Sequence, residues 1–143
     1  MARCIGCDSC MLACARLVYQ SFTPHKSAIQ VRSRGGVMGR MVADICRACA
    51  APAPCVEACP TEALRTRGGD RGMVYRKEAC TGCHACEEAC PVRAIGWDEE
   101  EDRPVLCIFC GQCTRFCPHD CLEMVEVGLV DSTPGSEGHL AEP

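Results

Sequence analysis

Residues 80–91 read Cys-Thr-Gly-Cys-His-Ala-Cys-Glu-Glu-Ala-Cys-Pro, with four cysteines at the spacing C-x2-C-x2-C-x3-C and a proline directly after them. The same spacing returns at residues 4–14 and 107–117, and residues 46–59 carry a stretched version, C-x2-C-x5-C-x3-C. Proline also follows the runs at 46–59 and 107–117, whereas Ala15 follows the first run. One cysteine motif therefore occurs four times and organises the chain.

This spacing is the bacterial ferredoxin signature for [4Fe–4S] clusters, in which three cysteines in a tight loop wrap a cluster and a fourth thiolate arrives from elsewhere. Gly6, Gly82 and Gly111 stand between cysteines, where a positive φ lets backbone N–H groups approach sulfur at low cost. We therefore expect four [4Fe–4S] clusters. Their candidate ligands are the sixteen cysteines of the four runs: Cys4, Cys7, Cys10, Cys14, Cys46, Cys49, Cys55, Cys59, Cys80, Cys83, Cys86, Cys90, Cys107, Cys110, Cys113 and Cys117.

The composition favours folding around metal. The chain has 17 cysteines in 143 residues but only 4% aromatic residues, so it lacks the apolar bulk of an ordinary core. A structural or regulatory zinc module is the alternative of a different class, but zinc sites typically use separated C-x2-C pairs, which four consecutive four-cysteine runs fit poorly. Cys121 lies outside the runs, and we expect it to be a partly buried free thiol.

Charge and hydropathy restrict the partners. No run of 18 apolar residues occurs, so we expect no membrane span, and a start at Met1-Ala2-Arg3-Cys4 without a signal peptide predicts a cytoplasmic location. The formal net charge is −4, and four oxidised clusters with their thiolates would bring it to about −12. So negative a protein is a poor ligand for nucleic acid.

Between the runs, the sequence predicts an α+β fold of tandem bacterial ferredoxin-like modules, with short hairpins and short helices around a small core organised by the clusters. The tail at 127–143 is rich in Gly, Ser, Pro and Glu, and we expect it to be extended or mobile. The other expected elements are a helix at 11–19, a hairpin of strands 29–33 and 37–45 about Gly35 and Gly36, a helical turn at 61–64, a turn at 68–72 before a strand at 73–75, an echo of this unit at 92–97, and an acidic turn at 98–102.

Four further side chains stand near the runs. His84 and His119 are interpreted as residues of exposed loops, although a role in proton-coupled transfer is conceivable for either. Tyr75 and Trp97 are interpreted as covers over a cluster and not as electron carriers.

The order of the runs (plain, stretched, plain, plain) resembles the iron–sulfur electron-transfer subunits of molybdenum and tungsten enzymes, a polyferredoxin family related to the dimethyl sulfoxide reductase type. The resemblance covers roughly residues 1–126. The fourth run of that family usually has a long insertion between its second and third cysteines, which Cys110-Gly111-Gln112-Cys113 lacks. This compactness is most similar to the four-cluster subunit of tungsten aldehyde oxidoreductases or of related acyl-CoA reducing enzymes.

The resemblance implies that the outer runs pair and the inner runs pair within one four-cluster domain. The domain would cover residues 1–126, with outer runs at 1–20 and 104–126, inner runs at 46–96, and the tail beyond it. Pairing of sequential runs stays open, because the linkers suit both arrangements. The implied ligand sets are Cys4, Cys7, Cys10 and Cys117; Cys107, Cys110, Cys113 and Cys14; Cys46, Cys49, Cys55 and Cys90; and Cys80, Cys83, Cys86 and Cys59.

The expected function is electron transfer without catalysis, because complete clusters leave no open iron for a substrate and no nucleotide or flavin signature occurs. The resemblance implies a relay between a catalytic subunit, of the tungsten or molybdenum pterin type, and a flavin subunit or soluble ferredoxin. The alternatives are a free soluble polyferredoxin shuttle, or the iron–sulfur subunit of a hydrogenase or carbon monoxide dehydrogenase. Clusters near the surface at both ends would also permit end-to-end self-association.

Overall fold

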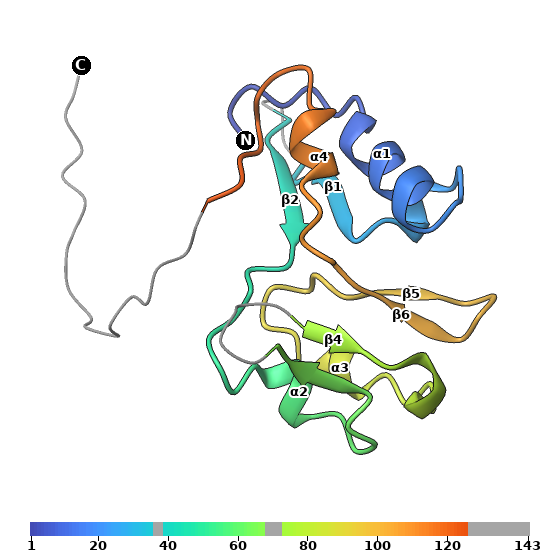
Figure 1. Cartoon of the computed structure of the whole chain (residues 1–143). Helices are drawn as coiled ribbons and strands as arrows, with labels where there is room; N and C mark the ends of the chain where they lie inside the picture. The colour runs from blue at the N-terminus through green and yellow to red at the C-terminus, as the bar shows by residue number, and fades with distance from the viewer. Residues whose placement is uncertain (36–38, 68–72, 126–143) are drawn as a thin grey trace, which may run out of the picture.

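The computed structural model describes residues 1–35, 39–67 and 73–125, and the predicted turn at 68–72 and tail at 127–143 lie outside these residues. The described part is an α+β fold of short hairpins and short helices, as predicted (Figure 1). Its elements in chain order are α1 (Ser9–Val18), η1 (Pro24–Lys26), β1 (Ile29–Ser33), β2 (Met41–Ile45), α2 (Pro54–Glu57), β3 (Leu64–Thr66), β4 (Met73–Tyr75), η2 (Lys77–Ala79), α3 (Ala85–Glu88), β5 (Gly96–Asp98), β6 (Arg103–Val105) and α4 (Gln112–Arg115).

Three antiparallel hairpins separate the cysteine runs. β1 pairs with β2 from Ile29 opposite Ile45 to Ser33 opposite Met41, so the predicted second strand is confirmed over Met41–Ile45. Its predicted start at 37–38 lies outside the described residues, and 39–40 are not strand. The β3–β4 and β5–β6 hairpins follow the second and third runs and are equal in length, which agrees with the internal repeat.

The helical turn predicted at 61–64 is wrong, because the short helices lie inside the cysteine runs. α2, α3 and α4 each contain the third cysteine of a run, and Leu64 already belongs to β3. The proline after the fourth cysteine lacks an N–H and cannot continue the helix, so the chain turns there. In the first run Ala15 replaces that proline, and α1 accordingly continues to Val18.

The molecule has two halves with separate small cores. Figure 1 shows α1, α4 and the β1–β2 hairpin together, which we call the outer half, and α2, α3 and the β3–β4 hairpin together, which we call the inner half. The cores consist partly of cysteine, with Cys10 and Cys14 in the outer core and Cys55 and Cys86 in the inner core. At the end of β6 the neighbours Val105 and Leu106 enter the outer and inner cores respectively. Among the described helices, none is long and apolar enough to cross a membrane.

Candidate iron–sulfur cluster sites

The sixteen thiols of the runs lie around four pockets. Every pocket is lined by three cysteines from one run and by the fourth cysteine of another run, and one of the pockets is also lined by Cys46. Pocket A is bordered by Cys4, Cys7, Cys10 and Cys117; pocket B by Cys14, Cys107, Cys110 and Cys113; pocket C by Cys46, Cys49, Cys55 and Cys90; and pocket D by Cys59, Cys80, Cys83 and Cys86. The structure thus brings together the members of each set that the family resemblance implies.

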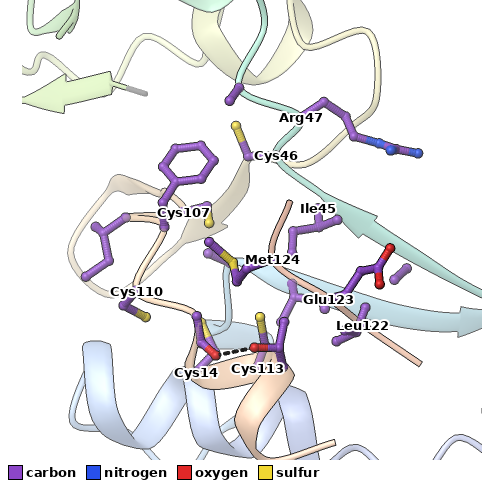
Figure 2. Close-up of a pocket in the computed structure, with 18 of the residues that line it drawn as sticks. Cys14, Ile45, Cys46, Arg47, Cys107, Cys110, Cys113, Leu122, Glu123 and Met124 are labelled. Carbon is purple, nitrogen blue, oxygen red and sulfur yellow. Dashed lines mark hydrogen bonds between the residues drawn. The ribbon is translucent and has the colours of Figure 1, made fainter. Parts of the chain in front are cut away.

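Pocket B is the most open of these spaces, with a volume of about 610 Å³. Figure 2 shows Cys14 and Cys113 at one end of the view and Cys46, which directly follows β2, at the opposite end. Cys46 lines pocket B as well as pocket C. Cys121 in turn lines both pocket A and pocket B.

The pockets follow one another in the order A, B, C, D. Cys10 and Cys14 lie on α1 one turn apart, about 6 Å along the helix axis, and open into pockets A and B respectively. Pockets B and C share Cys46 at the contact between the halves. Pockets C and D are joined through the contact of α2 with α3.

The loops around the first three cysteines curl because particular residues adopt a positive φ. The prediction for Gly6, Gly82 and Gly111 is confirmed, with φ values of 71°, 68° and 70°. The place of Gly6 and Gly82, just before the second cysteine, is taken in the second and fourth runs by Ala48 and Phe109, with φ values of 48° and 57°. A side chain in this region is strained, so the run geometry is imposed on these two residues by their surroundings.

In three runs a backbone turn with a positive φ follows the fourth cysteine and its proline. After the proline, Glu62, Arg93 and Asp120 adopt φ values of about 50°. This turn aims the next backbone N–H back at sulfur: Ala94 N donates to Cys90 Sγ and Cys121 N to Cys117 Sγ, both at 3.3 Å. The sequence pattern did not reveal these turns, because none of the three residues is glycine.

Burial sets the protonation of the deepest thiols. Loss of solvent raises the pKa of Cys10, Cys55, Cys86 and Cys107 to about 11 in each case. These groups are therefore protonated at neutral pH unless a cation replaces the proton. Cys7, Cys83 and Cys110 are exposed and border the mouths of pockets A, D and B.

The structure also places the other singled-out residues. Tyr75 and Trp97 both line pocket D, and the imidazole of His84 stacks on the Trp97 ring with centroids 3.7 Å apart. His84 is exposed, as predicted, but His119 is half-buried and lines pocket A, so its interpretation as an exposed residue is wrong. Cys121 is half-buried, as predicted.

The donor set fits iron–sulfur clusters. Every pocket offers four thiols and, in the described residues, no three His, Cys, Asp or Glu side chains lie close enough to hold a single metal ion. Four soft sulfur ligands around a space suit a cluster of iron and sulfide. The backbone donors to Cys90 and Cys117 supply the hydrogen bonds to sulfur that such clusters require.

Comparison with known proteins points to the same chemistry. A family model described as a 4Fe-4S dicluster domain matches residues 45–95 and 79–122, and one described as a 4Fe-4S binding domain matches residues 1–19. The chain is 30% identical, over 99% of its length, to the beta subunit of NADH-dependent phenylglyoxylate dehydrogenase from Aromatoleum evansii, of which it spans only 32%.

Two further relatives are matched over most of their own length. The B subunit of anaerobic dimethyl sulfoxide reductase from Escherichia coli is 28% identical, with 98% of this chain and 76% of that subunit covered. The polyferredoxin-like subunit of aliphatic sulfonate oxidoreductase from Pyrococcus furiosus is 32% identical, with 86% of this chain and 73% of that subunit covered.

Proposed function

The protein belongs to the 4Fe-4S dicluster family of iron–sulfur electron-transfer subunits, and from that premise we propose that it holds one [4Fe–4S] cluster in each of pockets A to D and relays single electrons along their row. The observation that carries this proposal is the grouping of sixteen thiols in fours around four successive pockets. When bound, such clusters supply one-electron redox chemistry.

In this proposal the residues of the chain bind the clusters, orient them and shield them from water. The buried Cys10, Cys55 and Cys86 anchor pockets A, C and D on helices, and apolar neighbours such as Leu64 and Ile95 exclude water between pockets C and D. The exposed Cys7 and Cys83 bring the two ends of the row to the surface, where electrons enter and leave. No residue is required to perform bond chemistry, and the subunit is accordingly non-catalytic.

We further propose that the partner is a catalytic oxidoreductase subunit of the tungsten or molybdenum pterin type, with a flavin subunit or a soluble ferredoxin at the other end of the row. The likeness to the dimethyl sulfoxide reductase and aliphatic sulfonate oxidoreductase subunits supports this choice. A second candidate is a 2-oxo acid dehydrogenase that uses NADH, favoured by the match of almost the whole chain to the phenylglyoxylate dehydrogenase subunit.

Anaerobic isolation from the native host by a mild affinity tag tests both levels of this proposal. About sixteen iron and sixteen sulfide per chain are expected for four clusters. A copurifying subunit with tungsten or molybdenum, measured by elemental mass spectrometry, would support the pterin partner. A thiamine-containing partner without tungsten or molybdenum would favour the second candidate, and two zinc ions per chain in place of iron would refute the relay.

Alanine variants test the nested ligand sets. Cys90→Ala should remove the same paramagnetic signal as Cys49→Ala, because both side chains border pocket C. If it instead removes the signal lost in Cys110→Ala, the third and fourth runs pair sequentially. Cys121→Ala is the matched control and should retain all the iron, since the bond to Cys117 comes from the backbone N–H of residue 121.

A further inference from the structure

Tyr75 carries a buried hydroxyl that makes no hydrogen bond with any of the described residues. Tyr75 ends β4 opposite Leu64, and its ring packs against the inner core. Among the described residues, its oxygen is the one buried side-chain nitrogen or oxygen atom with no hydrogen-bond partner. A buried polar group left in this state is costly, so such groups almost always find a partner when the site is complete.

The neighbours of this hydroxyl identify where the proton can go. Tyr75 lines pocket D, and Cys80, one of the four thiols of that pocket, lies beside the hydroxyl. Arg103 is the other polar neighbour, but its guanidinium already donates to the carbonyl of Lys77 and offers no acceptor. A tyrosine hydroxyl has an ordinary pKa of about 10, so it keeps its proton at neutral pH and can donate it.

Tyr19 in the outer half shows the opposite arrangement. Its hydroxyl donates to the carbonyl of Leu106 at 2.5 Å and accepts from the N–H of Leu106 at 2.8 Å. The proton of Tyr19 is therefore fully committed to the backbone, although the ring also lies near thiols of pocket B. The two tyrosines differ in the availability of one proton, which makes Tyr19 a matched control.

We propose that Tyr75 tunes the cluster of pocket D by donating a hydrogen bond from its hydroxyl to the Cys80 thiolate or to a sulfide of that cluster. The inference rests on the proposed function. A donor to sulfur stabilises the reduced, more negative state of a cluster and so raises its reduction potential. Tyr75 thereby makes the last cluster of the row a better electron acceptor from pocket C.

The test compares Tyr75→Phe and Tyr19→Phe with the wild-type holoprotein in a redox titration followed by paramagnetic resonance. In Tyr75→Phe the midpoint reduction potential of one of the four clusters should fall. The expected change is up to about tenfold in the equilibrium constant of reduction, or about 59 mV for one electron. Cys83→Ser, a ligand variant of the same pocket, shows which midpoint belongs to pocket D. Tyr19→Phe should leave that midpoint in place. In heavy water, electron–nuclear double resonance should detect one exchangeable deuteron that disappears in Tyr75→Phe.

The alternative outcomes separate this inference from the proposed function. An unchanged pocket D midpoint in Tyr75→Phe, with a clear shift in Cys83→Ser, would overturn the role of Tyr75 alone. A deuteron that persists in Tyr75→Phe would also overturn it, because a water molecule would then be the donor. Equal shifts of all four midpoints would show a general structural effect and refute specific tuning. A preparation with no cluster assignable to Cys83 would refute the four-cluster relay itself, and the tuning role with it.

Discussion

Replacement of Gly82 by alanine should destabilise the holoprotein by about 2–3 kcal/mol. Gly82 has a φ of 68°, where any side chain costs roughly 1–2 kcal/mol. An added Cβ would also lie 3.0 Å from Cγ of Asp102 and closer still to its Oδ2. Asp102 must then move, although it accepts a hydrogen bond from Trp97 Nε1 at 3.1 Å, a bond worth about 0.5–1.5 kcal/mol.

Gly111→Ala is the matched control, because Gly111 has nearly the same φ, 70°, but the nearest atom to an added Cβ would be Met124 Cγ at 3.4 Å, an ordinary contact. Anaerobic loss of visible cluster absorbance in the presence of a chelator gives the rate for each variant. Cluster loss is irreversible, so rates are the proper comparison. An excess of about 1 kcal/mol corresponds to roughly fivefold faster loss in Gly82→Ala than in Gly111→Ala. Equal rates of cluster loss in Gly82→Ala and Gly111→Ala would refute the collision with Asp102. It would also be refuted if the Gly82→Ala/Asp102→Ala double variant still lost its clusters faster than Gly111→Ala.

Three further outcomes are expected. Ala48→Gly should slow cluster loss about two- to fivefold, since it relieves strain at a φ of 48° at the cost of some chain entropy, and faster loss would contradict this reasoning. Chelation and oxidation of the clusters should abolish the circular dichroism of α1 and the hairpins, because cysteines form part of both cores, and a folded apoprotein would disprove that dependence. Burial raises the pKa of Asp98, but hydrogen bonds from Lys26 and from the backbone N–H groups of Glu101 and Glu100 lower it overall. The contribution of the ionised Asp98 carboxylate to the free energy of unfolding is therefore fully present above the unfolded-state pKa of about 3.9, and it is lost as the pH falls below that value. The difference in unfolding free energy between wild type and Asp98→Asn should accordingly be constant from pH 6 to 8.

The spacing of the cysteines was enough to predict the candidate ligands and the hairpins between the runs, because loop length and strand periodicity are local properties. The positions of the short helices were predicted incorrectly. A proline after Cys59 or Cys90 could be interpreted as the start of a helix, whereas the helices of the structure precede it and end at Glu57 and Glu88.

Other features depend on contacts between distant segments and leave no local signal. The positive φ of Phe109 contradicts the intrinsic preference of a bulky residue, and only its neighbours impose it. The sequence allowed the interpretation that Tyr75 covers a cluster. It did not show that the Tyr75 hydroxyl lacks a hydrogen-bond partner among the described residues, because the neighbouring Arg103 comes from another hairpin. The position of Cys121 between pockets A and B depends likewise on the meeting of the first and fourth cysteine runs.

The meeting of the first and fourth runs in pockets A and B has a consequence for synthesis on the ribosome. Pocket C and pocket D are complete in sequence once residue 90 has emerged, but pocket A needs Cys4 together with Cys117, 113 positions later. Chains fold from the N-terminus as they are made, and long-range closure is slow. The inner half is therefore the first part that can accept iron, while the first three cysteines wait as bare thiols until Cys117 has been made. A cell that makes this protein must guard those thiols from oxygen and stray metal until the fourth run arrives.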